Sequence, residues 1–150
     1  MRKARRILKR SKLERGAHVV TDEMLIERAK STIHFRQISP QVDVGSVACA
    51  LVTEQGDVFI GINIDAKCSL GFCAEHNAIG AMLTHGQNKV RTIVAVNSRG
   101  QILPPCGRCR ELMYQLDDSG ETRIILKDRV ALLGDLLPDF WVRSKYQSSG

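Results

Sequence analysis

The sequence predicts a three-layer α/β/α domain in which helices cover both faces of a mixed β-sheet. Residues 47–64 read as a β-hairpin, and segments with helical spacing alternate with short apolar runs in the second half of the chain. Strands that alternate with helices favour a sheet enclosed between helical layers. The 150 residues are 43% hydrophobic, which suffices for one compact core, and the chain is too short for two domains of usual size.

The first half is expected to contain a helix and the hairpin. Thr21 can cap a helix at about residues 22–34, where apolar side chains recur at helical spacing. Two β-rich runs, at residues 47–52 and 58–64, flank a polar turn at residues 54–57. This is the pattern of a β-hairpin.

Helices and strands alternate in the second half. Gly86 can end one helix, and the Pro104-Pro105 pair separates a strand from the next helix. The expected order is a helix from Cys73, a strand at residues 91–97, a helix at residues 106–116, a strand at residues 122–126 and a last helical turn at residues 131–137.

The positive charge of the chain is concentrated at its start. The formal net charge is +6; eight Lys or Arg side chains against Glu14 give residues 1–15 a charge of +7, which leaves −1 for residues 16–150. We therefore expect a basic tail at residues 1–15 and a single domain at residues 16–150, for which nucleic acid is not an expected partner. The sequence shows neither a membrane-spanning run nor a secretory signal, so a cytoplasmic protein with no membrane partner is expected.

Five cysteines, an odd number, are explained better by metal binding than by disulfides. Cys49 lies in an apolar run and is interpreted as a core residue, whereas Cys68 lies in a loop. Cys106 and Cys109 are three residues apart on a predicted helix, so their thiols face one side, and Cys73 can complete the set. Three protein ligands leave the fourth position of a tetrahedral zinc ion open, as in catalytic sites.

Glu75 is the candidate catalytic residue. It lies two residues from a cysteine ligand and is not needed for coordination, so its carboxylate can move protons during the reaction. Zinc with three thiolates has a formal charge of −1, which backbone donors and Arg108, Arg110 or His76 must offset.

Two motifs give the chain a family resemblance. Residues 73–75 (Cys-Ala-Glu) and 105–109 (Pro-Cys-Gly-Arg-Cys) resemble the motifs of the three-cysteine branch of the zinc-dependent cytidine deaminase superfamily. The similarity extends over residues 46–140. It includes residues 61–65 (Gly-Ile-Asn-Ile-Asp), similar to a ribose-reading segment, and residues 136–140 (Leu-Leu-Pro-Asp-Phe), similar to a C-terminal family motif.

The resemblance implies a cytidine deaminase-like fold and the hydrolytic deamination of a cytosine-type nucleoside, such as cytidine or deoxycytidine, with release of ammonia. It also implies a Zn²⁺ cofactor, a small-molecule pyrimidine nucleoside or analogue as the partner, and a homotetramer with active sites near subunit boundaries. Asn63, Asp65 and Ala74 are the substrate-binding residues that it implies.

Several residues depart from the family pattern. His76 follows the Glu where nucleoside deaminases usually have Arg, and Asp65 replaces the expected Glu. The loop at residues 66–72 is shorter, and residues 38–45 lack the family's Phe-Pro-Val-Gly. Since the aminoacyl-nucleoside antibiotic deaminases, typified by blasticidin S deaminase, also lack this Arg, their activity is an alternative.

Other interpretations stay open at this point. A closed, structural zinc site could use His76 or Cys68 as its fourth ligand. Asn63 and Asp65 could simply end a strand in a solvated turn. At the level of function, the alternatives are a polynucleotide-editing deaminase, which requires a basic and aromatic path to the site, and a non-catalytic zinc-binding protein.

Overall fold

A computed structural model describes residues 19–141, so the predicted basic tail at residues 1–15 lies outside the described residues. Within residues 19–141, no helix is long and apolar enough to cross a membrane. The elements in chain order are α1 (Asp22–Thr32), β1 (Arg36–Ser39), β2 (Val42–Thr53), β3 (Val58–Ala66), the 3-10 turn η1 (Lys67–Ser69), α2 (Ala74–Thr84), β4 (Val90–Asn97), β5 (Ile102–Leu103), α3 (Gly107–Leu116), β6 (Arg123–Ile125), β7 (Val130–Leu132) and α4 (Leu133–Leu136).

The predicted helices and strands are present, and three short strands are added to them. β1, β5 and β7 were not expected, and residues 130–132, where the last helical turn was predicted to begin, pair with β6 as a strand. Helix α4 is confined to four residues as a result.

The sheet is built outward from β2. Strand β2 pairs antiparallel with β3 on one side and with β4 on the other, and β4 pairs in parallel with β6. The short strands β1, β5 and β7 pair antiparallel with β2, β4 and β6. One parallel pair among antiparallel ones makes the sheet mixed, as predicted.

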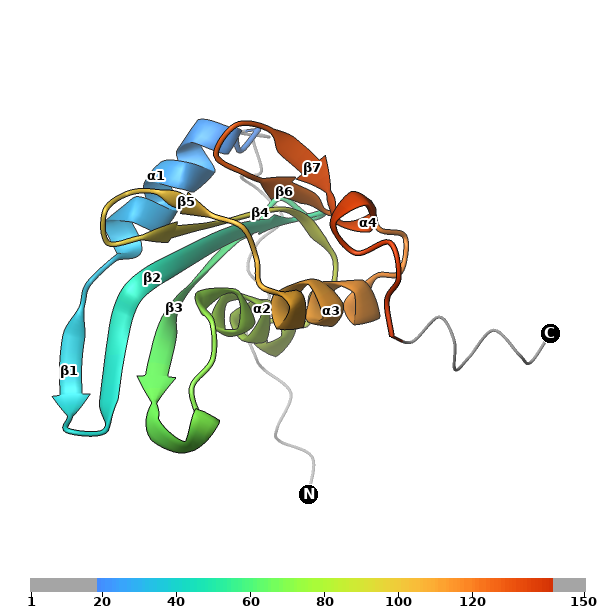
Figure 1. Ribbon diagram of the computed structural model, residues 1–150. Coiled ribbons are helices and arrows are strands. Elements are labelled where there is room, and N and C mark those ends of the chain that lie inside the picture. Colours follow the sequence, from blue (N-terminus) through green and yellow to red (C-terminus); the bar gives the residue numbers. More distant parts are fainter. Residues whose placement is uncertain (1–18, 142–150) are drawn as a thin grey trace, which may run out of the picture.

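Helices cover both faces of this sheet. Alternate residues of β2 point to opposite faces: Ala50 and Val52 pack with α1, while Cys49 and Leu51 belong to the core that includes α2 and α3. Figure 1 shows α1 on one side of the sheet, with α2 and α3 side by side on the other. The predicted three-layer α/β/α architecture is confirmed.

A bulge in β2 interrupts its pairing with β3. Val44 pairs with Ile64 and Ala48 pairs with Ile62, so three residues of β2 stand opposite Asn63 alone. Gly45 allows this bend because its φ of +76° is unfavourable for other residues. The bulge lies on the strand segment that borders the candidate site.

Candidate active site

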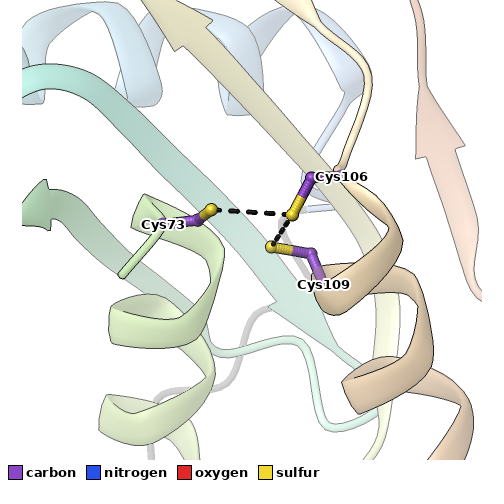
Figure 2. Close-up of side chains that lie close together, drawn as sticks. All are labelled: Cys73, Cys106 and Cys109. Carbon is purple, nitrogen blue, oxygen red and sulfur yellow. Dashed lines mark hydrogen bonds between the residues drawn. The ribbon is translucent and has the colours of Figure 1, made fainter. Parts of the chain in front are cut away.

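Three thiols meet where α2 and α3 begin. Cys73 is the residue that precedes α2, Cys106 precedes α3, and Cys109 lies in the first turn of α3. The Sγ atom of Cys106 lies 3.7 Å from that of Cys73 and 3.5 Å from that of Cys109. In Figure 2 the three side chains point toward one another from the two helix starts.

The spacing of the three sulfurs fits a tetrahedral zinc ion. Zn–S bonds of about 2.3 Å at tetrahedral angles separate neighbouring sulfurs by about 3.8 Å, close to the observed 3.7 and 3.5 Å. Among the described residues, the group that can hold a metal consists of Cys73, Cys106 and Cys109. Neither His76 nor Cys68 belongs to it, which argues against the closed structural site.

The three thiols differ in how readily they ionise. Burial raises the pKa of Cys73, and burial followed by the charge of Glu75 raises the pKa of Cys109. Burial also acts on Cys106, but hydrogen bonds from the backbone of Cys109 and from the neighbouring thiols lower its pKa overall. Cys106 therefore ionises first, and a bound cation is needed to favour the other two thiolates.

Glu75 lies beside the thiols in the first turn of α2. Its side chain is buried, with 5% of the residue exposed, and this burial raises the pKa of its carboxyl group. Hydrogen bonds with its own backbone N–H and with Cys109 act in the opposite direction. A buried carboxyl group with a raised pKa holds a proton more readily than an ordinary carboxylate, which suits a group that accepts and returns protons.

The three residues predicted to offset the thiolate charge lie in different places. His76 Nδ1 lies 3.4 Å from Cys109 Sγ, and burial followed by the charge of Arg108 lowers the pKa of His76. Arg110 instead donates to the carbonyl oxygens of Pro105 and Leu136, at 2.8 and 3.0 Å. Arg108 is exposed and lines the cavity beside the thiols. The side chain of His76 thus contacts a thiol, and the backbone of Arg108 hydrogen-bonds with the thiol of Cys106.

A cavity of about 480 Å³ opens at the thiols. It brings together most of the predicted site residues, namely Asn63, Asp65, Cys73, Ala74, Glu75 and Cys106. Cys109 does not line it. Sequence reasoning did not assign the apolar wall of Val47, Phe72 and Leu103, because tertiary contacts bring these residues together and no local pattern marks them.

Asn63 and Asp65 belong to β3 and do not end it in a turn. Asn63 is buried, and its Oδ1 accepts a hydrogen bond from the backbone N–H of Val47 at 2.8 Å. Its Nδ2 donates to Ser46 Oγ at 2.9 Å and to Asp65 Oδ2 at 2.7 Å. The bulge removes hydrogen bonds between the backbones of β2 and β3, and the side chain of Asn63 supplies others in their place. The alternative of a solvated turn is wrong.

The remaining cysteines take no part in the thiol group. Cys49 is fully buried in the core, as expected. Cys68 is exposed in η1.

The geometry of this site agrees with the comparison to known proteins. Residues 19–124 match the family described as the cytidine and deoxycytidylate deaminase zinc-binding region. The chain belongs to this family. It is therefore a zinc-dependent hydrolytic deaminase, and its three-cysteine group fits the Zn²⁺ cofactor.

Relatives of known activity support the assignment. A cytidine deaminase of Mycobacterium tuberculosis is 34% identical over 95 residues, which are 63% of this chain and 71% of that protein. Blasticidin-S deaminase of Bacillus cereus is 34% identical over 76 residues, 45% of this chain and 54% of that enzyme.

Solved structures share the fold. Cytidine deaminase from Mycobacterium tuberculosis superposes with a TM-score of 0.68 at 29% identity, covering 79% of this chain and 95% of that one. The enzyme from Burkholderia pseudomallei gives 0.66 at 33% identity, covering 81% and 99%. The predicted cytidine deaminase-like fold is confirmed.

Proposed function

We propose that this protein deaminates a small cytosine-type nucleoside, such as cytidine or deoxycytidine, and releases ammonia. The observation that carries the proposal is the shared cavity: two of the three thiols and the buried carboxyl group of Glu75 line one opening of about 480 Å³, a volume in the range of small-ligand sites. Mycobacterial and Burkholderia relatives named cytidine deaminase support this substrate class.

Cys73, Cys106 and Cys109 would hold the zinc ion, which supplies a Lewis acid that makes water nucleophilic at neutral pH. Glu75 accepts a proton from the attacking water and passes it to the ring nitrogen next to the reacting carbon. Glu75 would then take the remaining proton from the added hydroxyl group and give it to the amino group, so that the C–N bond breaks, the carbonyl forms and ammonia leaves. His76, in contact with Cys109, orients that thiolate, and Asp65 holds the sugar side of the substrate.

We also propose that residues 16–150 carry out catalysis and that residues 1–15 take no part in it. The charge of −1 on residues 16–150 favours a neutral nucleoside over a polynucleotide. A cytoplasmic location stays a prediction from the sequence.

Ammonia release over a substrate panel tests the proposed function. The panel contains cytidine, deoxycytidine, blasticidin S and single-stranded DNA. Each substrate is tested with the zinc-loaded full-length protein and with a zinc-loaded variant that lacks residues 1–15. We expect the fastest turnover on a nucleoside, and equal rates for the two proteins. Faster turnover of single-stranded DNA, or loss of nucleoside activity in a folded truncated protein, would make the basic segment a substrate-binding element.

Two controls complete this experiment. Cys106→Ser removes a proposed zinc ligand and should abolish turnover, whereas Cys68→Ser changes an exposed thiol outside the group and should not. Zinc binding without amine release from any substrate would support the non-catalytic alternative.

We also propose that the enzyme forms a homotetramer. Several large apolar side chains are exposed on the single chain, among them Phe35 and Ile38 of 59% exposure each and Leu70 of 75%. Exposed apolar groups of this size are common at subunit interfaces. Sedimentation velocity of the zinc-loaded protein should give four times the mass of one chain; a monomer would contradict the proposal.

A further inference from the structure

The face of the sheet that carries α1 keeps uncovered apolar surface on strand β3. Val58 pairs with Val52 and Ile60 pairs with Ala50, and directly paired residues share one face of a sheet. Val52 and Ala50 pack with α1, so Val58 and Ile60 lie on the α1 face as well, yet they are 36% and 42% exposed. Within residues 19–141, α1 covers this face, whereas α2 and α3 together cover the other (Figure 1).

A groove of about 540 Å³ follows α1 along this surface. Met24, Arg28 and Ser31 of α1 line it, because residues three or four apart lie on one side of a helix. Val58 lines it from β3. Val20, two residues before the start of α1, lines it too. Part of the groove therefore lies where the chain enters α1.

We propose that residues 1–18 of the same chain dock in this groove. The segment joins the described part of the chain at Val19, next to Val20 in the groove. The groove-lining residues of α1 from Met24 to Ser31 span about 10 Å along the helix, and an extended chain covers about 3.3 Å per residue, so the segment is long enough. It supplies three large apolar side chains, those of Ile7, Leu8 and Leu13, whose burial against the groove stabilises the docked state.

The covalent connection favours this occupant over a separate partner. A tethered ligand reaches an effective concentration of about a millimolar, so weak contacts suffice. Overall charge acts in the same direction, since residues 1–15 carry +7 and residues 16–150 carry −1. Within the groove it does not, because Arg28 and the ion pair of Glu27 with Lys30 leave no net negative charge there. Apolar contacts are therefore the larger contribution to docking.

The groove and the active site lie on opposite faces of the sheet. The groove borders α1, and the thiols lie where α2 and α3 begin (Figures 1 and 2). Docking therefore covers apolar surface that would attract other chains and leaves the active-site cavity open. The inference goes beyond the proposed function and does not depend on it.

Limited trypsin digestion of the zinc-loaded full-length protein tests the inference. Residues 1–15 hold eight Lys or Arg side chains, and cleavage follows the population of the undocked segment when docking is fast. We expect Val58→Ser to raise the cleavage rate within residues 1–15 about 3- to 10-fold, since it removes part of one buried aliphatic side chain. Replacing Ile7, Leu8 and Leu13 together by Ser should raise it at least as much. Each rate is divided by that of a free peptide with the same sequence.

Val130→Ser is the matched control. Val130 is a similarly exposed valine, at 42%, on β7 at the opposite edge of the sheet, and it does not line the groove. Its variant should be cleaved like the wild type. Cleavage within residues 19–141 is followed in the same digests and should stay slow in every variant, which separates undocking from unfolding. At about 1 M NaCl, where charges are screened, the ratio of Val58→Ser to the wild type should not change.

Three results would overturn the inference. The first is an equal cleavage rate for Val58→Ser and the wild type, or an equal rise for Val58→Ser and Val130→Ser. The second is protection of residues 1–15 that increases with protein concentration, which would assign the groove to a second copy of the chain. The third is a ratio that falls to one at high salt, which would mean that charge and not the apolar groove holds the segment.

Discussion

Glu75 combines burial with a position in the first turn of α2, beside the thiols. Its carboxyl group contacts Cys109 and borders the cavity, and burial raises its pKa. In the proposed reaction this residue moves the protons while the thiols hold the metal. The roles of the two kinds of side chain can therefore be separated by substitution.

We expect Glu75→Gln to lower kcat at least about 100-fold, since positioned proton transfer contributes that much or more. The zinc content should stay at one ion per chain because the amide keeps the size of the side chain and no ligand is lost. Steady-state ammonia release and metal analysis measure the two quantities. Glu54→Gln, on the exposed hairpin turn, is the control; near-normal turnover of Glu75→Gln would assign proton transfer to another group.

His76 contacts one of the three thiols. Its Nδ1 lies 3.4 Å from Cys109 Sγ, and partners that orient metal ligands typically account for 10- to 100-fold in metal affinity. We expect His76→Ala to weaken zinc binding about 10-fold, measured by competition with a chromogenic chelator. His34→Ala, an exposed histidine outside the site, should bind zinc like the wild type. Equal affinities for both variants would show that the contact does not support the metal.

At the scale of elements, the close approach of α2 to β3 places both Cys73 and Glu75. This approach depends on Gly61, where a Cβ atom would collide with the backbone N of Ala78 and the backbone O of Ala74. Both atoms belong to α2, so any side chain at residue 61 must move the helix. The helix that follows one proposed metal ligand and carries the proposed proton carrier therefore depends on a glycine in the neighbouring strand.

Gly61→Ala should lower the free energy of unfolding by about 1–3 kcal/mol, the usual cost of overpacking, and should lower kcat as well. Gly80→Ala is the matched control, because no atom lies near a Cβ at that position of α2. It should raise the free energy of unfolding by about 0.5–1 kcal/mol, as alanine favours a helix over glycine. Urea unfolding followed by circular dichroism measures both; equal effects would mean that α2 is not held by this contact.

The elements also show what local sequence can predict. The helices that begin at Cys73 and Cys106 have local signals, namely helical spacing, a terminating glycine and a preceding proline pair, and both were predicted close to their observed bounds. Strands β5 and β7 have two and three residues, and their pairing with distant strands decides their conformation. Too few residues are present for a periodic pattern.

The candidate site likewise has features that local sequence predicts and features that only the tertiary structure decides. Cysteine spacing and the adjacent Glu are local, so the thiol group could be predicted from the sequence and the structure brings it together. The hydrogen bond from Asn63 to Ser46 could not be predicted, because it depends on a bulge whose register is set by β3. The side chain of Asn63 hydrogen-bonds with Val47, Ser46 and Asp65, and its contact with a substrate stays a prediction. Sequence spacing gives no information on which partner a polar group will take.

At the scale of the whole molecule, the thiol group joins the two helices that cover one face of the sheet. Cys73 precedes α2, while Cys106 and Cys109 belong to the start of α3. A metal ion bound there is a cross-link between segments more than 30 residues apart, and binding to the folded state alone stabilises that state. Removing the ion should therefore loosen the face of the sheet that holds the cavity.

We expect a strong chelator to lower the Tm of the zinc-loaded protein by about 10 °C, since a ligand at 100 times its Kd adds about 2.7 kcal/mol of stability. Cys106→Ser should start at the lower Tm and should not respond to the chelator, because it lacks one of the three thiols. Cys68→Ser keeps the thiol group and should behave like the wild type. Differential scanning fluorimetry with and without chelator measures all three proteins. A wild-type Tm that is insensitive to zinc removal would mean that packing alone fixes α2 against α3, and that the metal serves the reaction without supporting the fold.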